Sequence, residues 1–264
     1  MTPILTFDIE TIPDVAGLRR VLDLGPEVSD AAVAEAAFEA RRQKTGGSDF
    51  LPHHQHRVLC ISCALHTAEG FRVFSLCGED EARNIQRFYD GIERYTPTLV
   101  SWNGSGFDLP VLNYRALVHG LRATRFWEQG DDDRDFKWNN YVSRYHSRHT
   151  DLMDVLAMYG RGGVPLDEMA QLLGLPGKLG MDGSKVWSAY LAGGMEDIRR
   201  YCETDVVNTH MVYLAFQHLR GHLSQTAWRD QQALVRQTLS AIDEPHWREF
   251  LPRWETRGEA APAV

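Results

Sequence analysis

Residues 4–13, ILTFDIETIP, place two carboxylates inside an apolar, strand-like run. Residues two apart on a strand point to the same face, so Asp8 and Glu10 stand side by side while Phe7 and Ile9 pack on the other face. Adjacent carboxylates repel each other and lose solvation when they are partly buried. A divalent cation is their usual partner, which predicts a metal site here. A solvated strand end is the alternative.

The composition is that of an ordinary globular protein. The chain has 264 residues, of which 43% are apolar and 24% are charged, enough for one large domain or two small ones. The net charge of −8 argues against a protein that coats nucleic acid nonspecifically. It does not exclude an enzyme that acts on nucleic acid, since bound cations offset metal-binding carboxylates.

Several absences in the sequence favour a cytoplasmic protein. No run of about 18 apolar residues could cross a membrane, and the N-terminus resembles no secretory signal. Four cysteines in a chain of this length do not form a disulfide framework. Histidines at 53, 54 and 56 lie near Cys60 and Cys63, which suggests a zinc site. The two cysteines would face opposite sides of one strand, however, so we interpret them as buried small hydrophobes.

The order of the expected elements is that of an α/β domain with an antiparallel portion. A hairpin over 58–76 follows a partly helical excursion from the sheet at 14–51, and a short strand is expected at 98–102. Residues 126–150 look irregular, and order resumes at 151–156. The expected helices cover 31–42, 79–95, 107–119, 165–173, 184–191, 196–219 and 224–241. Ligands of such sheets gather where strand ends meet helix N-termini.

Two further acidic motifs follow the first. Asn103-Gly-x-x-Phe107-Asp108 comes directly after the strand at 98–102, and Tyr201-x-x-x-Asp205 lies in the long helix. Residues four apart share one helical face, so Tyr201 and Asp205 are neighbours there. The alternative for this pair is a tyrosine hydroxyl that merely satisfies a buried acid.

These three motifs, in this order, resemble those of the DEDD superfamily of 3′–5′ exonucleases. Within it, the chain is similar to the stand-alone predicted exonuclease family related to the proofreading domain of B-family DNA polymerases. The resemblance covers about residues 1–220, including 165–178 and 201–208. Tyrosine at position 201, with Arg200 where the histidine type would carry its histidine, indicates the tyrosine (DEDDy) type.

The resemblance implies a ribonuclease-H-like mixed sheet flanked by helices. We expect an exonuclease domain at 1–220, a helical extension at 221–257 and a disordered tail at 258–264. Two Mg²⁺ or Mn²⁺ ions would act on a phosphodiester, since hard ions prefer oxygen ligands. By resemblance, Asp8 bridges both ions, Glu10 and Asp205 complete the water-activating site, and Asp108 serves the second ion. Tyr201 would orient the attacking water.

Candidate substrate contacts lie around these motifs. By resemblance, Asn103 and Phe107 contact the terminal nucleotides, and Thr11 is a further candidate. Phe107 could equally be a core residue that anchors its loop. Residues 137–149 interleave basic and aromatic side chains, which suits a single-strand groove or a loop that caps a sheet edge. Its candidate contacts are Arg144, Tyr145 and Arg148.

Lys178 and Lys185 are further candidates for phosphate contacts, and Asp154 is a candidate for support of the site. The acids at 131–135 would repel phosphate, so we expect them to lie away from its path.

The predicted activity is 3′–5′ exonucleolysis of single strands, DNA more than RNA, with release of nucleoside 5′-monophosphates. The alternatives are a catalytically weak nucleic-acid-binding module and an exoribonuclease on short RNA. No residue was found that reads the 2′-hydroxyl. The chain leaves no room for a polymerase domain, so a role in DNA repair or end trimming is expected. The sequence indicates neither protein partners nor an oligomeric state.

Overall fold

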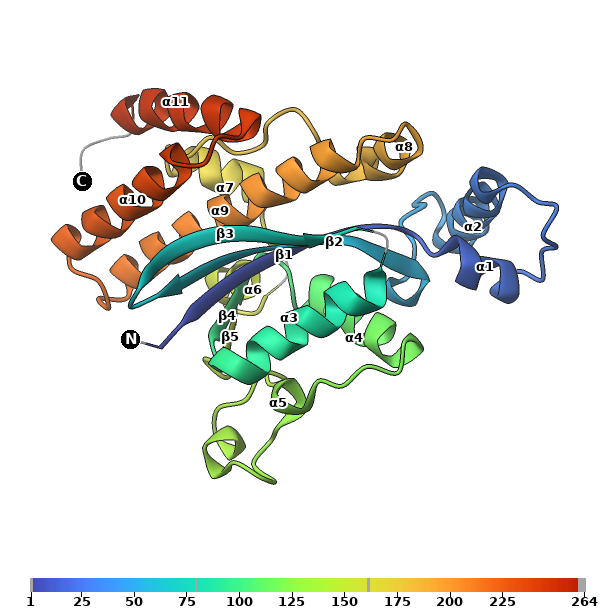
Figure 1. The fold of residues 1–264 in the computed structure, drawn as a ribbon, viewed down its shortest axis with the longest axis horizontal. Helices are drawn as coiled ribbons and strands as arrows, with labels where there is room; N and C mark the ends of the chain where they lie inside the picture. The colour runs from blue at the N-terminus through green and yellow to red at the C-terminus, as the bar shows by residue number, and fades with distance from the viewer. Residues whose placement is uncertain (1, 79, 161, 261–264) are drawn as a thin grey trace.

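A five-stranded sheet in the order β3-β2-β1-β4-β5 organises the computed structural model (Figure 1). The structure describes residues 2–78, 80–160 and 162–260, the last six by backbone alone. Strand β1 (Ile4–Pro13) pairs antiparallel with β2 (His56–Thr67), which pairs antiparallel with β3 (Gly70–Cys77). On its other edge β1 runs parallel to β4 (Thr98–Ser101), and β4 runs parallel to β5 (His149–Asp151). The expected mixed sheet flanked by helices is confirmed.

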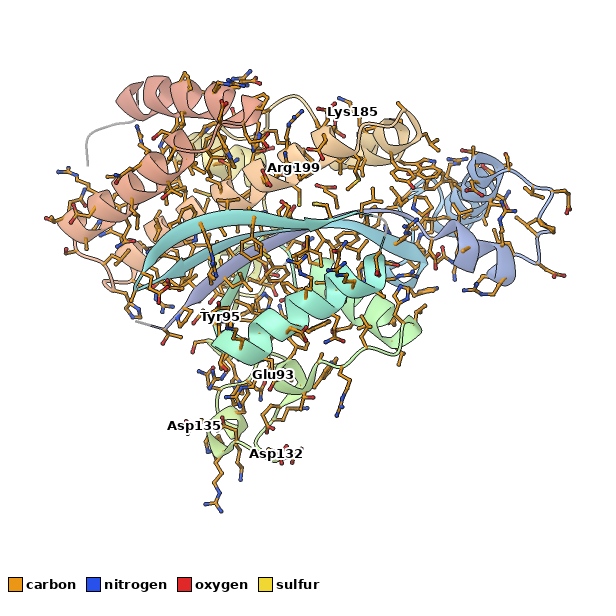
Figure 2. The ribbon with its side chains drawn as sticks, in the orientation of Figure 1. Glu93, Tyr95, Asp132, Asp135, Lys185 and Arg199 are labelled. Carbon is orange, nitrogen blue, oxygen red and sulfur yellow. A yellow bond between two sulfur atoms is a disulfide. The ribbon has the colours of Figure 1, made fainter. Side chains whose placement is uncertain are left out.

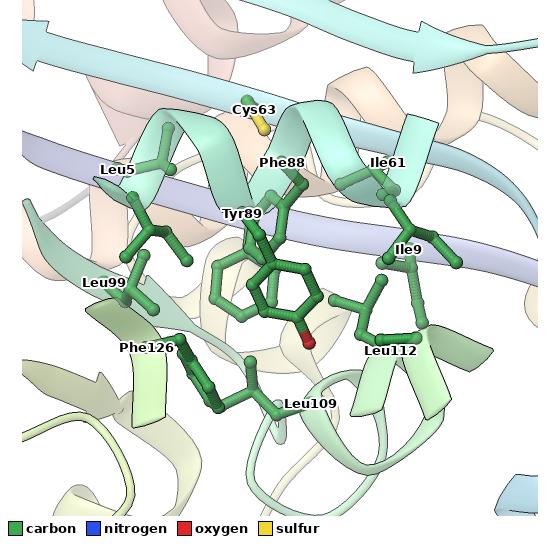
Figure 3. Packing of buried hydrophobic residues seen from close by; sticks show 14 of the residues in the cluster. Leu5, Ile9, Ile61, Cys63, Phe88, Tyr89, Leu99, Leu109, Leu112 and Phe126 are labelled. Atoms are coloured by element: carbon green, nitrogen blue, oxygen red, sulfur yellow. The ribbon is translucent and has the colours of Figure 1, made fainter. Parts of the chain in front are cut away.

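The first face of the sheet carries α3 (Glu81–Tyr95) and α4 (Asp108–Val118), with α5 (Thr124–Trp127) beyond them (Figure 1). Leu5, Phe7 and Ile9 of β1 all join the core on this face, as the two-residue period of a strand requires. Figure 3 shows Phe88 and Tyr89 of α3 packed among them. The odd-numbered residues of β1 therefore serve stability, and the even-numbered ones are left for the other face.

The opposite face is covered by the long helix α9 (Met195–Leu219), together with α7 (Leu166–Leu172) and α10 (Gln225–Ser240) (Figure 1). Its core includes Val100 of β4, Val206 of α9 and Leu239 of α10. The short helices α6 (Leu152–Leu156) and α8 (Val186–Leu191) complete the chain between β5 and α9. Helix α9 thus lies against the face to which the even-numbered residues of β1 point.

The excursion between β1 and β2 forms a small helical unit at one end of the sheet (Figure 1). It contains α1 (Val15–Val21) and α2 (Asp30–Thr45), whose buried Leu18 and Val33 pack with Leu51. The short 3-10 turns of the chain lie at His53–Gln55, Arg134–Lys137 and Gly183–Lys185.

Three features differ from the sequence expectations. Residues 149–151 form the edge strand β5, although residues 149 and 150 were expected to be irregular. The expected helical C-terminal extension is present, but its second helix, α11 (Pro245–Ala260), was not predicted individually, and it continues through residues 258–260, the start of the expected disordered tail. Its aromatic residues Trp247, Phe250 and Trp254 are buried, so tertiary packing accounts for a helix that the internal Pro252 disfavours. Residues 261–264 lie outside the described part.

The cysteines also differ from expectation. Cys60 of β2 and Cys77 of β3 are directly opposite in the register and form a disulfide. Sequence spacing could not reveal this pair, because only the β2–β3 register brings the two residues together. Cys63 is buried in the core on the α3 face, as expected for a small hydrophobe. Among the described residues, no helix has both the length and the hydropathy that a bilayer crossing requires.

Candidate active site

Asp8 and Glu10 lie on the face of β1 that meets α9. Phe7 and Ile9 occupy the opposite face, so the alternation predicted from the sequence is present. The pairing with β2 shifts register between Glu10 and Thr11, which marks a bulge at this point of the strand. Bulges bend a strand and redirect its side chains, and they are common beside active sites. Glu10 is 7% exposed, whereas Asp8 is more accessible.

Asp108 reaches β1 from the start of α4. Its Oδ1 accepts a hydrogen bond of 3.1 Å from the backbone N–H of Ile9, the residue between the two acids of β1. The side chain is 4% exposed. This bond explains how a residue one hundred positions along the chain is held beside Asp8 and Glu10, and it leaves Oδ2 of Asp108 for another partner.

Helix α9 supplies Tyr201 and Asp205, both 7% exposed, on the face toward β1. The Tyr201 hydroxyl donates a hydrogen bond to Asp205, which lowers the pKa of that acid against the larger effect of burial. Cys202, one position beyond Tyr201, is fully buried, and its thiol donates to Oδ2 of Asp8 at 3.4 Å. The three motifs are therefore brought together across β1, α4 and α9.

The four carboxylates of this cluster are buried close together, with too little positive charge nearby to balance them. Burial is the largest cause that raises the pKa of Asp8 and Glu10, and the neighbouring carboxylates raise both further. Burial also raises the pKa of Asp108 to about 7 and that of Asp205 to about 6. Such a set holds a proton or a cation near neutral pH, and divalent ions fit it because they prefer several oxygen ligands.

Cys202 is the unexpected member of the cluster. One ligand atom from each of Asp8, Glu10 and Cys202 lies within 4.8 Å of the others, the one such group among the described residues. A thiolate would favour a softer ion than Mg²⁺ or Mn²⁺. Burial raises the pKa of the Cys202 thiol, however, so it remains a hydrogen-bond donor. The carboxylates are thus the better candidate ligands for a hard divalent ion. Among the described residues, no group of possible metal ligands includes Cys60 or Cys63, where the sequence suggested zinc.

Lys178 is the cation that the structure places beside the acids. Its ammonium lies 5.7 Å from the ring centroid of Tyr201, and its charge lowers the pKa of Glu10 and of Asp205. The backbone N–H of Lys178 is fixed by Asp167 Oδ1 at 2.7 Å, and Asn208 of α9 donates to the carbonyl of Gly177 at 3.0 Å. From the sequence, Lys178 was expected only as a phosphate contact. In the structure, the hydrogen bonds of its loop hold it beside Glu10 and Asp205.

The loop after β4 is held by Asp151, at the end of β5. Asp151 accepts from the backbone N–H of Asn103 and of Ser105, each at 2.9 Å, and also caps α6. Asn103 adopts a φ of 63°, in the left-handed region that asparagine tolerates. A Cβ at Gly104 would lie 2.3 Å from Ser101 Oγ, so this position requires glycine.

Thr11 and Phe107 lie beside the acids, in the wall of a pocket that Glu10 also lines. The hydroxyl of Thr11 is 2.9 Å from His56 Nδ1, and His56 Nε2 donates to the carbonyl of Leu51. Burial lowers the pKa of His56 to about 4, so the ring is neutral and its Nδ1 must accept from Thr11. Phe107 is half-buried, with its ring centroid 5.2 Å from that of His56. Both predicted contacts therefore border the acids.

The predicted contacts of residues 137–149 have different surroundings. Arg144 lines a hollow with Asn103, and its guanidinium pairs with Asp154 at 3.0 Å. Tyr145 is 71% exposed. The guanidinium of Arg148 lies 3.8 Å from the ring centroid of Phe136, within its own segment. Of these three, Arg144 is the one that the structure brings to the loop of the second motif.

The other charged residues considered in the sequence analysis lie on both sides of the sheet. Figure 2 shows Asp132 and Asp135 at the far end of the 126–150 segment, across the sheet from Lys185. These acids thus lie away from α9. Lys185 lines a separate hollow that reaches Tyr201, together with Arg200.

A family model described as a predicted 3′–5′ exonuclease related to the exonuclease domain of PolB matches residues 48–254. The chain belongs to this family. The matched range includes Asp108, Tyr201 and Asp205, whereas Asp8 and Glu10 precede it. In the structure, β1 holds these two acids beside Asp108 and Asp205, which lie within the matched range.

Two other comparisons complete the description. The chain is similar to a family B DNA polymerase from the hyperthermophilic archaeon Pyrobaculum calidifontis, at 16% identity and a TM-score of 0.49, over 98% of this chain and 29% of that protein. The chain thus spans less than a third of that polymerase. A comparison with curated proteins gave no match.

Proposed function

We propose that this chain is a two-metal-dependent 3′–5′ exonuclease that acts on single strands, prefers DNA to RNA and releases nucleoside 5′-monophosphates. The observation that carries the proposal is the meeting of four carboxylates from three elements, with raised pKa values and one cation beside them. Buried acids of one charge are costly, and a site for divalent cations explains why they are together.

The carboxylates have distinct proposed roles. Asp8, whose pKa is raised by all three of the other acids, would contact both ions, while Glu10 and Asp205 would complete one site and Asp108 the other. Divalent ions bound there would activate a water, shield the phosphodiester and stabilise the leaving oxygen. The thiol of Cys202 holds Oδ2 of Asp8, which fixes the orientation of that carboxylate.

Tyr201 has a role in orientation rather than proton abstraction. Burial and the neighbouring acids raise the pKa of its hydroxyl above the ordinary value, so the phenol stays protonated. Its proton is directed to Asp205, and the phenol oxygen can accept a hydrogen bond from a water beside the acids. Tyr201 thereby aims a lone pair of that water at the phosphorus.

Substrate would be held by the residues around the acids. Thr11 donates its proton to His56, so its oxygen accepts from the substrate, as from a terminal 3′-hydroxyl. Asn103 presents its side chain from a fixed loop, and Phe107 offers a ring face. Arg144 is proposed as a phosphate contact beside Asn103, and Tyr145 and Arg148 as contacts farther along the strand.

The experiment is digestion of single-stranded DNA labelled at either end, with Mg²⁺, Mn²⁺ or EDTA. We expect a 5′-labelled strand to shorten stepwise, a 3′ label to appear at once as mononucleotide, and EDTA to stop both. Asp8→Asn should abolish digestion, while Asp132→Asn, an exposed acid across the sheet, should leave it unchanged. Digestion in EDTA, or by Asp8→Asn, contradicts the proposal. Faster decay of a matched RNA would overturn the DNA preference alone.

A further inference from the structure

We propose that the excursion of residues 14–51 contributes a substrate contact, Phe50, which forms one wall of a pocket for the terminal base of the strand. This inference rests on the proposed function. The two helices of the excursion, α1 and α2, precede the range matched by the family model, which begins at residue 48 and includes Phe50. Neither the three motifs nor that model therefore assigns a role to the helical unit that delivers Phe50.

The excursion is anchored to the rest of the molecule on both sides. Asp14, which caps α1, accepts from Arg115 Nη1 of α4 at 2.6 Å, and its own N–H donates to the carbonyl of Gln55. At its far end, the carbonyl of Leu51 accepts from His56 Nε2 of β2 at 3.1 Å, and within the excursion Arg41 of α2 donates from Nε to the carbonyl of Phe50 at 2.8 Å. These bonds give the Phe50 backbone a defined position beside the sheet.

A pocket of about 490 Å³ joins this segment to the acids. Its wall includes Glu10 and Thr11 of β1, Phe107, Phe50 and Trp187 of α8. The volume lies within the range of small-molecule sites. A base is joined to its phosphate through one sugar, so a pocket that adjoins Glu10 is within reach of the base of a nucleotide whose phosphate lies at the acids.

Phe50 is placed to offer a ring face. Its ring centroid lies 5.5 Å from those of His56 and Phe107, yet the residue is 56% exposed. A phenylalanine that leaves more than half its surface in water contributes little core burial for its size. Beside two other rings and an open pocket, it has the arrangement of a stacking platform for bases.

The charges of the pocket favour a base over a phosphate. Among the described residues that line it there is neither lysine nor arginine, and Glu10 and Asp49 are acids. Its histidine, His56, is neutral near pH 7 because burial lowers its pKa. A phosphate would be repelled there, whereas a flat, uncharged base gains contact with the aromatic walls. Stacking of this kind tolerates all four bases, since each presents a π face.

The test compares Phe50→Ala, Phe50→Trp and the matched control Tyr114→Ala, an exposed aromatic of α4 outside the pocket. Each variant receives oligonucleotides that end in an ordinary 3′ nucleotide or in an abasic one. We expect Phe50→Ala to raise KM for the ordinary end about 5- to 100-fold, with kcat nearly unchanged. The abasic end should show no such change, and Phe50→Trp and Tyr114→Ala should behave as wild type.

A binding measurement separates this inference from the proposed function. The probe is an oligonucleotide with a 3′-terminal phosphorothioate linkage, titrated in Mg²⁺ against wild type and Phe50→Ala. Equal affinity of the two proteins for ordinary ends, or an equal loss for ordinary and abasic ends, overturns the role of Phe50. Metal-independent digestion by wild type contradicts the proposed function instead, and selective loss of binding to ordinary ends still supports the pocket.

Discussion

Single residues of the acid cluster make the metal-free protein sensitive to pH. Asp108 is buried, and its pKa is raised from 3.8 to about 7, chiefly by burial. A carboxyl whose pKa is higher in the folded state stabilises that state below its unfolded pKa, and this stability is lost as the pH rises through about 7. The metal-free fold is therefore expected to weaken between pH 4 and 8, the opposite of the usual behaviour of a salt-bridged acid.

Asp108→Asn tests this expectation. The amide keeps an oxygen that can accept from the N–H of Ile9 but cannot ionise. In EDTA, we expect the variant to lose less stability than wild type between pH 5 and 8, with a difference of at most about 3 kcal/mol. Urea unfolding at several pH values measures it. Parallel pH curves for the two proteins would show that Asp108 does not titrate in this range.

Tyr201→Phe tests the orienting hydroxyl. The change removes the hydrogen bond to Asp205 but retains the ring against Lys178. We expect kcat to fall about 10- to 100-fold, the effect of one lost bond to a charged partner, while Mn²⁺ affinity is nearly unchanged. Steady-state kinetics and calorimetry give the two values. A matching loss of metal affinity would show that Tyr201 acts on the ion site rather than on water.

At the scale of elements, the loop between β4 and α4 carries the second motif. Asp151, at the end of β5, accepts two amides of this loop and caps α6, so one side chain couples three elements. The sequence predicted β4 and α4, but not β5, because a three-residue strand carries too little periodicity to be recognised. The partner of the loop was therefore invisible until the chain was folded.

Asp151→Ala is expected to destabilise the protein by about 2–4 kcal/mol, since it removes two amide acceptors and a helix cap. Activity should fall as well, because Asn103 and Phe107 lose their fixed loop. Asp151→Asn, which retains one acceptor oxygen, should show an intermediate loss. Urea unfolding and oligonucleotide digestion check both variants. Unchanged unfolding of Asp151→Ala would mean that the loop is held by other contacts.

At the scale of the whole molecule, the sequence predicted the sheet, most of its helices and the five motif residues. These follow from strong local signals: alternation in β1, amphipathic periodicity in α3, and the four-residue spacing of Tyr201 and Asp205. Cys202 and Phe50 were not assigned to the site, and Lys178 was expected only as a phosphate contact rather than as a neighbour of the acids. Each reaches it only through packing between distant segments, and none carries a spacing signal of its own. Within the expected helical extension, α11 was not recognised as a separate helix because its internal proline opposes a helix that buried aromatics stabilise.

The most direct test is anomalous diffraction from crystals soaked in Mn²⁺ with a nucleoside 5′-monophosphate. We expect two manganese peaks about 3.5–4 Å apart. Asp8 should contact both, with Glu10 and Asp205 on one and Asp108 near the other. The phosphate should lie between them. A single peak bound through Cys202, or no peak among the four carboxylates, would contradict the two-metal centre.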